Sequence, residues 1–128
     1  MMGFKLIEES VFSNGYTAID LTELVESIVV ENKLYEGIVT VYSPEPSITI
    51  LLIEYEPSLL RDLEDFISKH TSRYKHVIDA LLGKSVIVPV VDGGLDTGVF
   101  KRIVLVDISY KRGSKRVLVG LEGVFRED

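Results

Sequence analysis

The sequence contains no cysteine, no tryptophan and no glutamine, and its only asparagines are Asn14 and Asn32. Without cysteine the chain cannot form disulfide bonds, use a thiolate nucleophile or bind a metal through sulfur. The shortage of thermolabile side chains favours a thermophilic source. Any chemistry must therefore come from histidine, carboxylate, hydroxyl or backbone groups.

Long apolar runs and clusters of positive charge are also missing. The chain has no uninterrupted apolar run of the roughly 18 residues that predict a membrane-spanning helix, and no signal peptide is visible, so we expect a cytoplasmic protein without membrane contact. The 14 basic residues are scattered and the formal net charge is -6, which argues against a nucleic-acid partner. Since 46% of the 128 residues are hydrophobic, we expect one domain over residues 1–128 with a buried core.

Turn residues and apolar periodicity predict the elements of the first half. Strands are expected at residues 4–8 and 16–19, joined as a hairpin by the Asn-Gly pair at 14–15. Apolar residues at helical spacing then predict a helix over residues 21–33. Two β-branched strands, at 38–42 and 47–55, flank a turn that contains two prolines.

The second half is predicted to hold two helices followed by strands. Apolar stripes predict helices over residues 57–69 and 73–82, with Pro57 in the first turn and Gly83 after the end. A buried strand follows at 85–90.

Two long strands, at 100–110 and 115–125, are expected to form the C-terminal hairpin. Because their apolar runs are nearly continuous, both faces should be covered, the second by another subunit. Together these elements predict an α+β fold, in which a mixed or antiparallel β-sheet sandwich carries about three helices on one face.

Metal-ligating residue types are present but scattered. His70 and His76 are six residues apart, which is not the spacing that puts two ligands on one face of a helix. Glu45, Glu54 and Asp79 would complete a metal site with them if the tertiary fold brought these side chains together. The alternative is that all five are ordinary surface residues.

The segment from residue 81 to residue 103 carries the most specific pattern. A Gly-x-Ser leads into a buried strand that ends in Pro-Val, and a glycine turn, a leucine and another glycine follow. The matching positions are Gly83, Ser85, Pro89, Val90, Asp92, Gly93, Leu95 and Gly98, with Pro57, Asp62 and Leu63 upstream. In these positions residues 21–116 resemble the YjbQ-like family, some members of which are described as secondary thiamine-phosphate synthases.

The polar positions of the family are only partly kept. Glu45 stands where the family has a histidine, and Glu54 lies one residue away from the position of a family glutamate. His76 aligns with the histidine before the third helix of the family, and His70 replaces a second histidine if two residues of that loop are deleted. Lys101 stands where the family has glutamine. The resemblance implies that these five residues form the catalytic site, with His76 as acid, base or ligand because the ordinary pKa of histidine is near neutral.

The resemblance also implies a reaction and an assembly. In that reaction a thiazole phosphate nitrogen attacks a pyrimidine methyl diphosphate and pyrophosphate departs, so the site needs cations or a divalent metal ion. The family is described as trimeric, which predicts a homotrimer with a small phosphorylated or anionic ligand. Two interpretations remain open: a divergent enzyme with weak or lost activity, and a non-catalytic oligomer that binds a small anionic metabolite or a protein partner.

Overall fold

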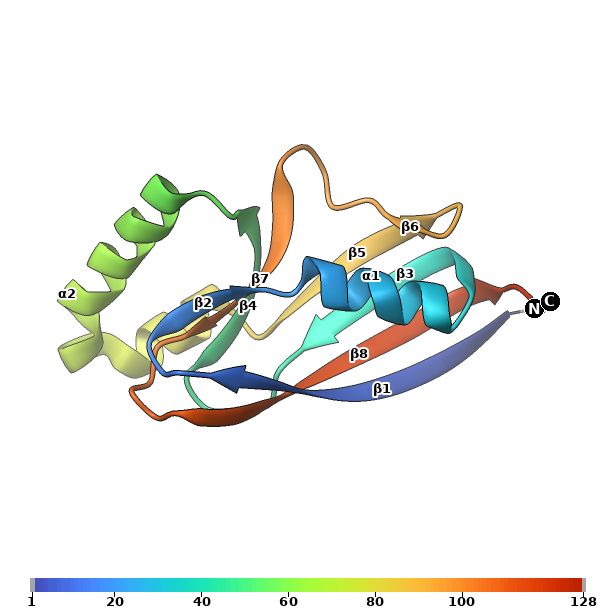
Figure 1. Cartoon of the computed structure of the whole chain (residues 1–128). Coiled ribbons are helices and arrows are strands. Elements are labelled where there is room, and N and C mark those ends of the chain that lie inside the picture. The colour runs from blue at the N-terminus through green and yellow to red at the C-terminus, as the bar shows by residue number, and fades with distance from the viewer. Residues whose placement is uncertain (1, 128) are drawn as a thin grey trace.

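Figure 1 shows the computed structural model, which describes residues 2–127 and, among them, the side chains of all but residues 71 and 72. The elements of this part follow one another in a fixed order: β1 (Met2–Ser13), β2 (Thr17–Asp20), α1 (Thr22–Glu31), β3 (Leu34–Tyr42), β4 (Ile48–Glu54), α2 (Pro57–Leu82), β5 (Ser85–Val91), β6 (Gly94–Leu95), β7 (Lys101–Asp107) and β8 (Gly113–Phe125).

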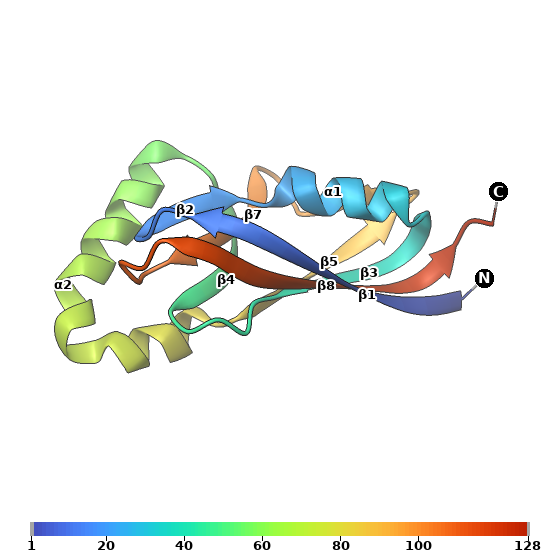
Figure 2. The same ribbon diagram turned by 60° about the horizontal axis from the view of Figure 1, so that its bottom comes forward.

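The strands form two antiparallel sheets. Sheet A has the order β1-β8-β3-β5-β6, and sheet B has the order β2-β7-β4. Figure 2 shows the long strands β1 and β8 running side by side. α1 lies along one side of these strands, and α2 lies at one end of the molecule. These sheets and helices confirm the predicted α+β fold with an antiparallel sandwich.

The main core lies between the two sheets. Val39 and Val119 point inward from sheet A, Leu105 points inward from sheet B, and all three are completely buried. α1 adds Val25 and Val29 to the same core and contacts strands of both sheets. Alternate residues of each strand face one side of its sheet, so this arrangement uses only one face of sheet A.

A second core lies between α2 and the other face of sheet B. Ile67 and Ile78 of α2 pack with Val104 and Val106 of β7. Strand β7 is therefore buried on both faces within one chain, which explains its continuous apolar run. The prediction that another subunit covers the second face of this strand is wrong, because α2 covers it.

The two predicted hairpins are also wrong. β1 pairs with β8 and β2 with β7, so the turn after β1 carries the chain from sheet A to sheet B. The connection from β7 to β8 returns the chain to sheet A. The β1–β2 and β7–β8 connections lie side by side. The Tyr16 ring stacks on Tyr110 with centroids 4.9 Å apart, and the Tyr16 N–H donates to the Ser109 carbonyl. The turn residues mark the change of direction but not the sheet that receives the next strand.

The helix signals of the sequence are confirmed with one change. α2 begins at Pro57, with the Glu56 carboxylate accepting hydrogen bonds from the first N–H groups, and ends before Gly83. The two helices predicted here are one element, kinked at Tyr74, where the backbone leaves the helical region. Within residues 2–127, no helix combines the length and the apolar character needed to cross a membrane.

The second face of sheet A, which we call the outer face, remains uncovered in the described part of the chain. Its exposed apolar side chains include Phe4 and Leu6 of β1 and Ile87 of β5, which are 65%, 59% and 61% exposed. The remaining members are Met2, Phe12, Ile38, Tyr42, Val91 and Val124. These positions alternate with inward residues along the strands, so the apolar side chains share one face, which also carries polar side chains such as Glu8, Thr40 and Glu122.

Candidate functional site

Two of the predicted site residues meet at the edge of sheet B. Glu54 ends β4, Lys101 begins β7, and the two are partners in the ladder between these strands. The Lys101 ammonium lies 3.1 Å from the Glu54 carboxylate, and both side chains are partly exposed. A bond from its own backbone N–H, followed by the bond from Lys101, lowers the pKa of the Glu54 carboxyl. Lys101 is thus already neutralised by a carboxylate.

A crevice of about 620 Å³ lies beside this ion pair and is lined by both acidic and basic groups. Asp20, Glu54 and Glu56 contribute carboxylates, and Arg102 contributes the guanidinium group. The Glu56 carboxylate accepts hydrogen bonds from the N-terminal N–H groups of α2, and the Arg102 guanidinium group donates to the Asp20 carboxylate. The crevice therefore has more negative than positive charge, which opposes binding of an anion.

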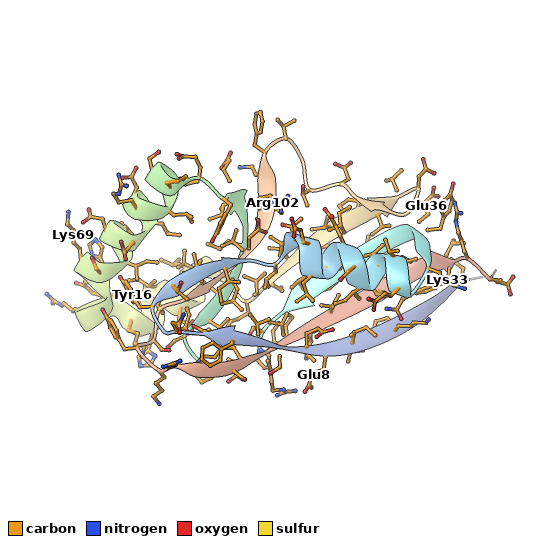
Figure 3. All side chains as sticks on the ribbon, in the orientation of Figure 1. Glu8, Tyr16, Lys33, Glu36, Lys69 and Arg102 are labelled. Atoms are coloured by element: carbon orange, nitrogen blue, oxygen red, sulfur yellow. The ribbon has the colours of Figure 1, made fainter. Side chains whose placement is uncertain are left out.

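The ion pair between Asp20 and Arg102 holds the start of α1 against β7. Figure 3 labels Arg102 beside these two elements. The guanidinium Nε donates to one carboxylate oxygen at 2.8 Å, and the Thr22 N–H donates to the other at 2.9 Å. Partial burial raises the pKa of Asp20, but the bonds from Thr22 and Arg102 outweigh it, so the pKa of this carboxyl lies below its ordinary value. This arrangement explains the start of α1, where the residue at the cap position makes no side-chain bond.

Glu45 lies in the connection between β3 and β4, away from the crevice. Its carboxylate accepts a hydrogen bond from the Arg116 N–H at 3.0 Å. The Lys84 ammonium donates to the backbone carbonyls of Glu45 and Ile48, at 2.7 Å and 2.6 Å, and forms an ion pair with Asp79 at 3.4 Å. Lys84 therefore joins this connection to the end of α2, and the carboxylate of Asp79 is paired with the Lys84 ammonium.

The two histidines lie on different segments of the kinked helix α2. The His70 ring packs against Phe66, with centroids 4.6 Å apart, and His76 is exposed beyond the kink. Among residues 2–127 the structure places no three histidine, aspartate or glutamate side chains close enough to hold a metal ion. The carboxylates proposed as ligands bind Lys101, Lys84 and Arg116 instead. The donor set does not fit a metal, and the catalytic roles of the five residues stay predictions.

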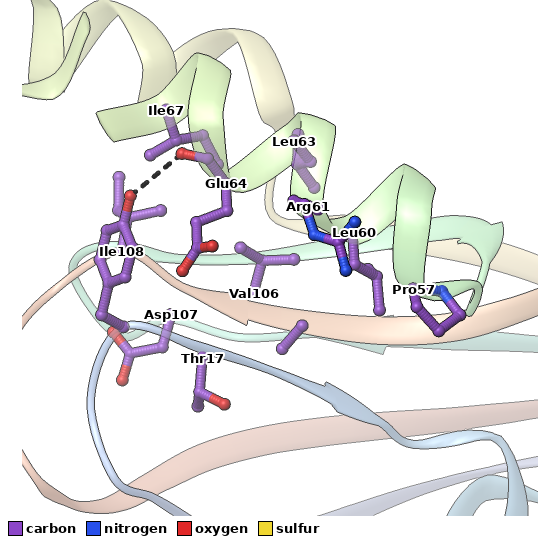
Figure 4. A pocket seen from close by; sticks show the side chains of 12 residues that line it. Thr17, Pro57, Leu60, Arg61, Leu63, Glu64, Ile67, Val106, Asp107 and Ile108 are labelled. Carbon is purple, nitrogen blue, oxygen red and sulfur yellow. Dashed lines mark hydrogen bonds between the residues drawn. The ribbon is translucent and has the colours of Figure 1, made fainter. Parts of the chain in front are cut away.

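A cavity of about 340 Å³, which the sequence did not predict, lies between α2 and sheet B (Figure 4). Leu63 and Ile67 of α2 face Ala18 of β2 and Val106 of β7 across it. The signal in the sequence was the small residue Ala18, which pairs with Val106 on the face of sheet B beneath α2, because a strand that packs fully beneath a helix carries larger side chains.

A buried carboxylate at the end of β7 was missed as well. Asp107 is 1% exposed, and its two oxygens accept hydrogen bonds from the Ser13 hydroxyl at 2.6 Å and from the Ser109 N–H and hydroxyl at 2.9 Å and 2.7 Å. The Lys115 ammonium lies 3.9 Å away. This network joins the ends of β1, β7 and β8, where the chain crosses between the sheets.

Comparison with known proteins finds similarity over most of the chain. Residues 9–123 match the family model described as UPF0047 protein YjbQ-like. A UPF0047 protein of Archaeoglobus fulgidus is 34% identical over 114 residues, which cover 79% of this chain and 87% of the relative. A UPF0047 protein of Methanothermobacter thermautotrophicus is 26% identical over 118 residues, 82% of each chain.

Solved structures agree with the fold. A YbjQ-like protein of unknown function from Sulfolobus solfataricus superimposes with a TM-score of 0.81 at 22% identity, over 95% of this chain and 100% of that one. An uncharacterised protein of the YjbQ/UPF0047 family from Clostridium acetobutylicum gives 0.78 at 23% identity, over 88% and 97%. At these identities the structures support the fold alone. The family model and the relative that is 34% identical show that this chain belongs to the UPF0047 family of YjbQ-like proteins.

Proposed function

We propose that this protein works in the cytoplasm as a homotrimer whose subunits meet through the outer face of sheet A. The observation that carries the proposal is the row of exposed apolar side chains on that face, including Phe4, Leu6 and Ile87. Apolar patches of this kind on a folded chain are typical of protein interfaces. The number of subunits rests on the resemblance to the YjbQ-like family.

Self-association through this face would bring a neighbouring subunit next to a predicted site residue. Glu8 and Arg116 form an ion pair of 3.1 Å at the border of the outer face. The N–H of Arg116 also binds the carboxylate of Glu45. Glu45 therefore lies beside the proposed interface, and a small-molecule site there would draw on two subunits.

We further propose that the transfer reaction implied by the resemblance is weak or lost. In that reaction the bond between the pyrimidine methyl carbon and the diphosphate oxygen breaks as the thiazole nitrogen attacks, and pyrophosphate leaves with the electron pair. The leaving group has to be stabilised by cations. Lys101 is the one lysine among the five predicted residues, and its ammonium group is paired with Glu54.

The remaining candidate is a non-catalytic oligomer that binds a small phosphorylated or anionic molecule or a protein partner. It is favoured by the internal pairing of the charged groups around the crevice, where Arg102 binds Asp20 and Lys101 binds Glu54. A site for chemistry on a polyphosphate would leave such cations open to the substrate.

Sedimentation of the purified protein tests the assembly. The wild-type mass should be about three times the monomer mass of 14.3 kDa at micromolar concentration. Ile87→Lys places a charge on the outer face and should give monomers, whereas Val99→Lys changes an even more exposed apolar residue outside this face and should leave the trimer intact. A wild-type monomer, or equal effects of the two substitutions, would contradict the proposed interface.

The activity is tested with the two substrates of the implied reaction. Pyrophosphate release should be barely above background, and a thiamine-phosphate auxotroph should grow poorly when it expresses this chain. Full rescue that is abolished by His76→Ala would contradict a weak or lost activity and would place His76 in the mechanism. Saturable binding of a phosphorylated substrate in calorimetry, without turnover, would support the binding protein.

A further inference from the structure

The cavity between α2 and sheet B has the size and lining of a small-molecule site. Its volume of about 340 Å³ lies within the range of roughly 300–1,000 Å³ that is usual for ligand pockets. Leu60, Leu63 and Ile67 of α2 and Val106 of β7 provide apolar walls. A ligand with an apolar body would therefore gain from leaving water.

An aromatic side chain forms part of the lining of the cavity. Tyr16 lines the cavity, and its hydroxyl donates a hydrogen bond of 3.3 Å to the backbone carbonyl of Glu64. The Tyr16 ring is fixed from behind by its stack on Tyr110, with an angle of 2° between the ring planes. The cavity thus has a rigid aromatic wall, which suits a flat ligand and a cationic group.

The charged side chains that line the cavity are two carboxylates, Glu64 and Asp107, and one guanidinium group, Arg61. Figure 4 shows the side chain of Glu64 directed from α2 toward the strands. Among the residues that the structure describes, its carboxylate has no hydrogen-bond or ion-pair partner. Burial raises the pKa of the Tyr16 hydroxyl, and the charges of Tyr110 and Glu64 raise it further.

The other charged groups that line the cavity are the carboxylate of Asp107 and the guanidinium group of Arg61. Asp107 is held by Ser13 and Ser109 and adds no positive charge. Arg61 is exposed on α2. Hydrogen bonds from Ser58 and Leu59 lower the pKa of the Glu56 carboxyl, and the charge of Arg61 adds the weakest contribution. One guanidinium group against the two carboxylates of Glu64 and Asp107 leaves the lining negative overall. The cavity therefore combines an apolar interior with an open carboxylate in its lining.

We propose that this cavity binds a small primary amine with a flat aromatic body, whose ammonium group lies against Glu64. The apolar body would fill the space between Leu63 and Val106, and the ammonium group would supply the missing partner of the carboxylate. This site is separate from the five residues of the predicted catalytic site and from the outer face of sheet A.

Tryptamine is a suitable probe, because it is protonated at neutral pH and the protein contains no tryptophan to mask indole fluorescence. Tryptophol and indole-3-acetate keep the ring but carry a neutral and a negative head group. Tryptamine should saturate one site per subunit with a Kd of about 1 mM or below, the range expected for a ligand of this size. Each of the other two compounds should bind at least threefold more weakly.

The matched variants are Glu64→Gln and Asp65→Asn on adjacent positions of α2. Asp65 forms an exposed ion pair with Lys69 and does not line the cavity, so its substitution should leave the Kd of tryptamine unchanged. Glu64→Gln should weaken tryptamine binding threefold or more, an effect limited because Glu64 is solvent-accessible. Ala18→Leu, which narrows the cavity without changing its charge, should weaken binding by the same factor or more.

These measurements decide the proposal. It is overturned by the absence of saturation, by equal binding of the three compounds, or by a change of less than threefold in Glu64→Gln. It is also overturned if Asp65→Asn weakens binding as much as Glu64→Gln, because the effect would then come from the net charge of the protein. Circular dichroism of each variant should match the wild type, and Glu64→Gln remains decisive if Ala18→Leu does not fold.

Discussion

The substitution Gly123→Ala should destabilise the protein strongly, because β3 and β8 come unusually close at this position. Gly123 of β8 faces Gly37 of β3, next to an irregularity in the register of β3. A Cβ atom on Gly123 would lie 2.6 Å from the Cα atom of Gly37 and still closer to the Glu36 carbonyl oxygen. Real Cβ contacts essentially never fall below 3.0 Å, so the two central strands of sheet A would have to move apart.

The expected loss follows from this geometry. Gly123 has a φ of 148°, a conformation that costs a residue with a side chain about 1–3 kcal/mol. Separating the strands by several tenths of an ångström would also weaken at least two ladder hydrogen bonds, each worth about 1 kcal/mol. The free energy of unfolding should therefore fall by about 3 kcal/mol or more.

Gly93→Ala is the matched control. Gly93 also has a positive φ, 80°, but a Cβ atom there would meet nothing within 4 Å. Alanine at this position should lower the free energy of unfolding only by the cost of its backbone conformation, about 1–2 kcal/mol. The difference between the two variants measures the steric contact between β3 and β8.

Urea unfolding followed by circular dichroism, at one protein concentration for all variants, gives both free energies. The reasoning would be refuted if Gly123→Ala were no less stable than Gly93→Ala. A Gly123→Ala protein that is insoluble while Gly93→Ala folds would agree with it.

Two further substitutions test the polar contacts that join the elements. The pKa of Asp20 is lowered by Thr22 and Arg102, so its contribution is present above the ordinary pKa of 3.8 and is lost as the pH falls through the lower folded value. Asp20→Asn should lower the free energy of unfolding by about 1 kcal/mol at pH 7, and urea titrations near pH 2 should show no difference from the wild type. A loss of stability that does not depend on pH would contradict this. Asp107→Ala should cost about 3 kcal/mol, because it leaves Ser13 and other buried donors without an acceptor; a thermal or urea measurement showing less than 1 kcal/mol would contradict the role of this network.

The secondary structure could be predicted where a local rule decided it. Pro57 and Gly83 mark the two ends of α2, and both act through their own backbone geometry. Asp92 and Gly93 form the turn between β5 and β6 with φ values of 51° and 80°, the positive values that a two-residue hairpin turn requires. None of these features depends on distant parts of the chain.

The candidate site was less predictable. The resemblance brought Glu54 and Lys101 into one group, and the structure places them in contact across β4 and β7. The resemblance could not reveal that Lys84 forms an ion pair with Asp79. A separation of five residues in the sequence does not fix the direction of either side chain. The open carboxylate of Glu64 was likewise hidden, since its surroundings come from strands far away in the sequence.

The sequence by itself determined which segments are helices and strands and which of their faces are apolar, because these follow from spacing along the chain and from turn residues such as Gly83. Only the tertiary structure decided that β1 joins β8 while β2 joins β7, and that α2 covers sheet B and leaves the outer face of sheet A bare. The physical reason is that backbone hydrogen bonds are alike between any two strands. The choice of partner therefore depends on how all the apolar faces pack together.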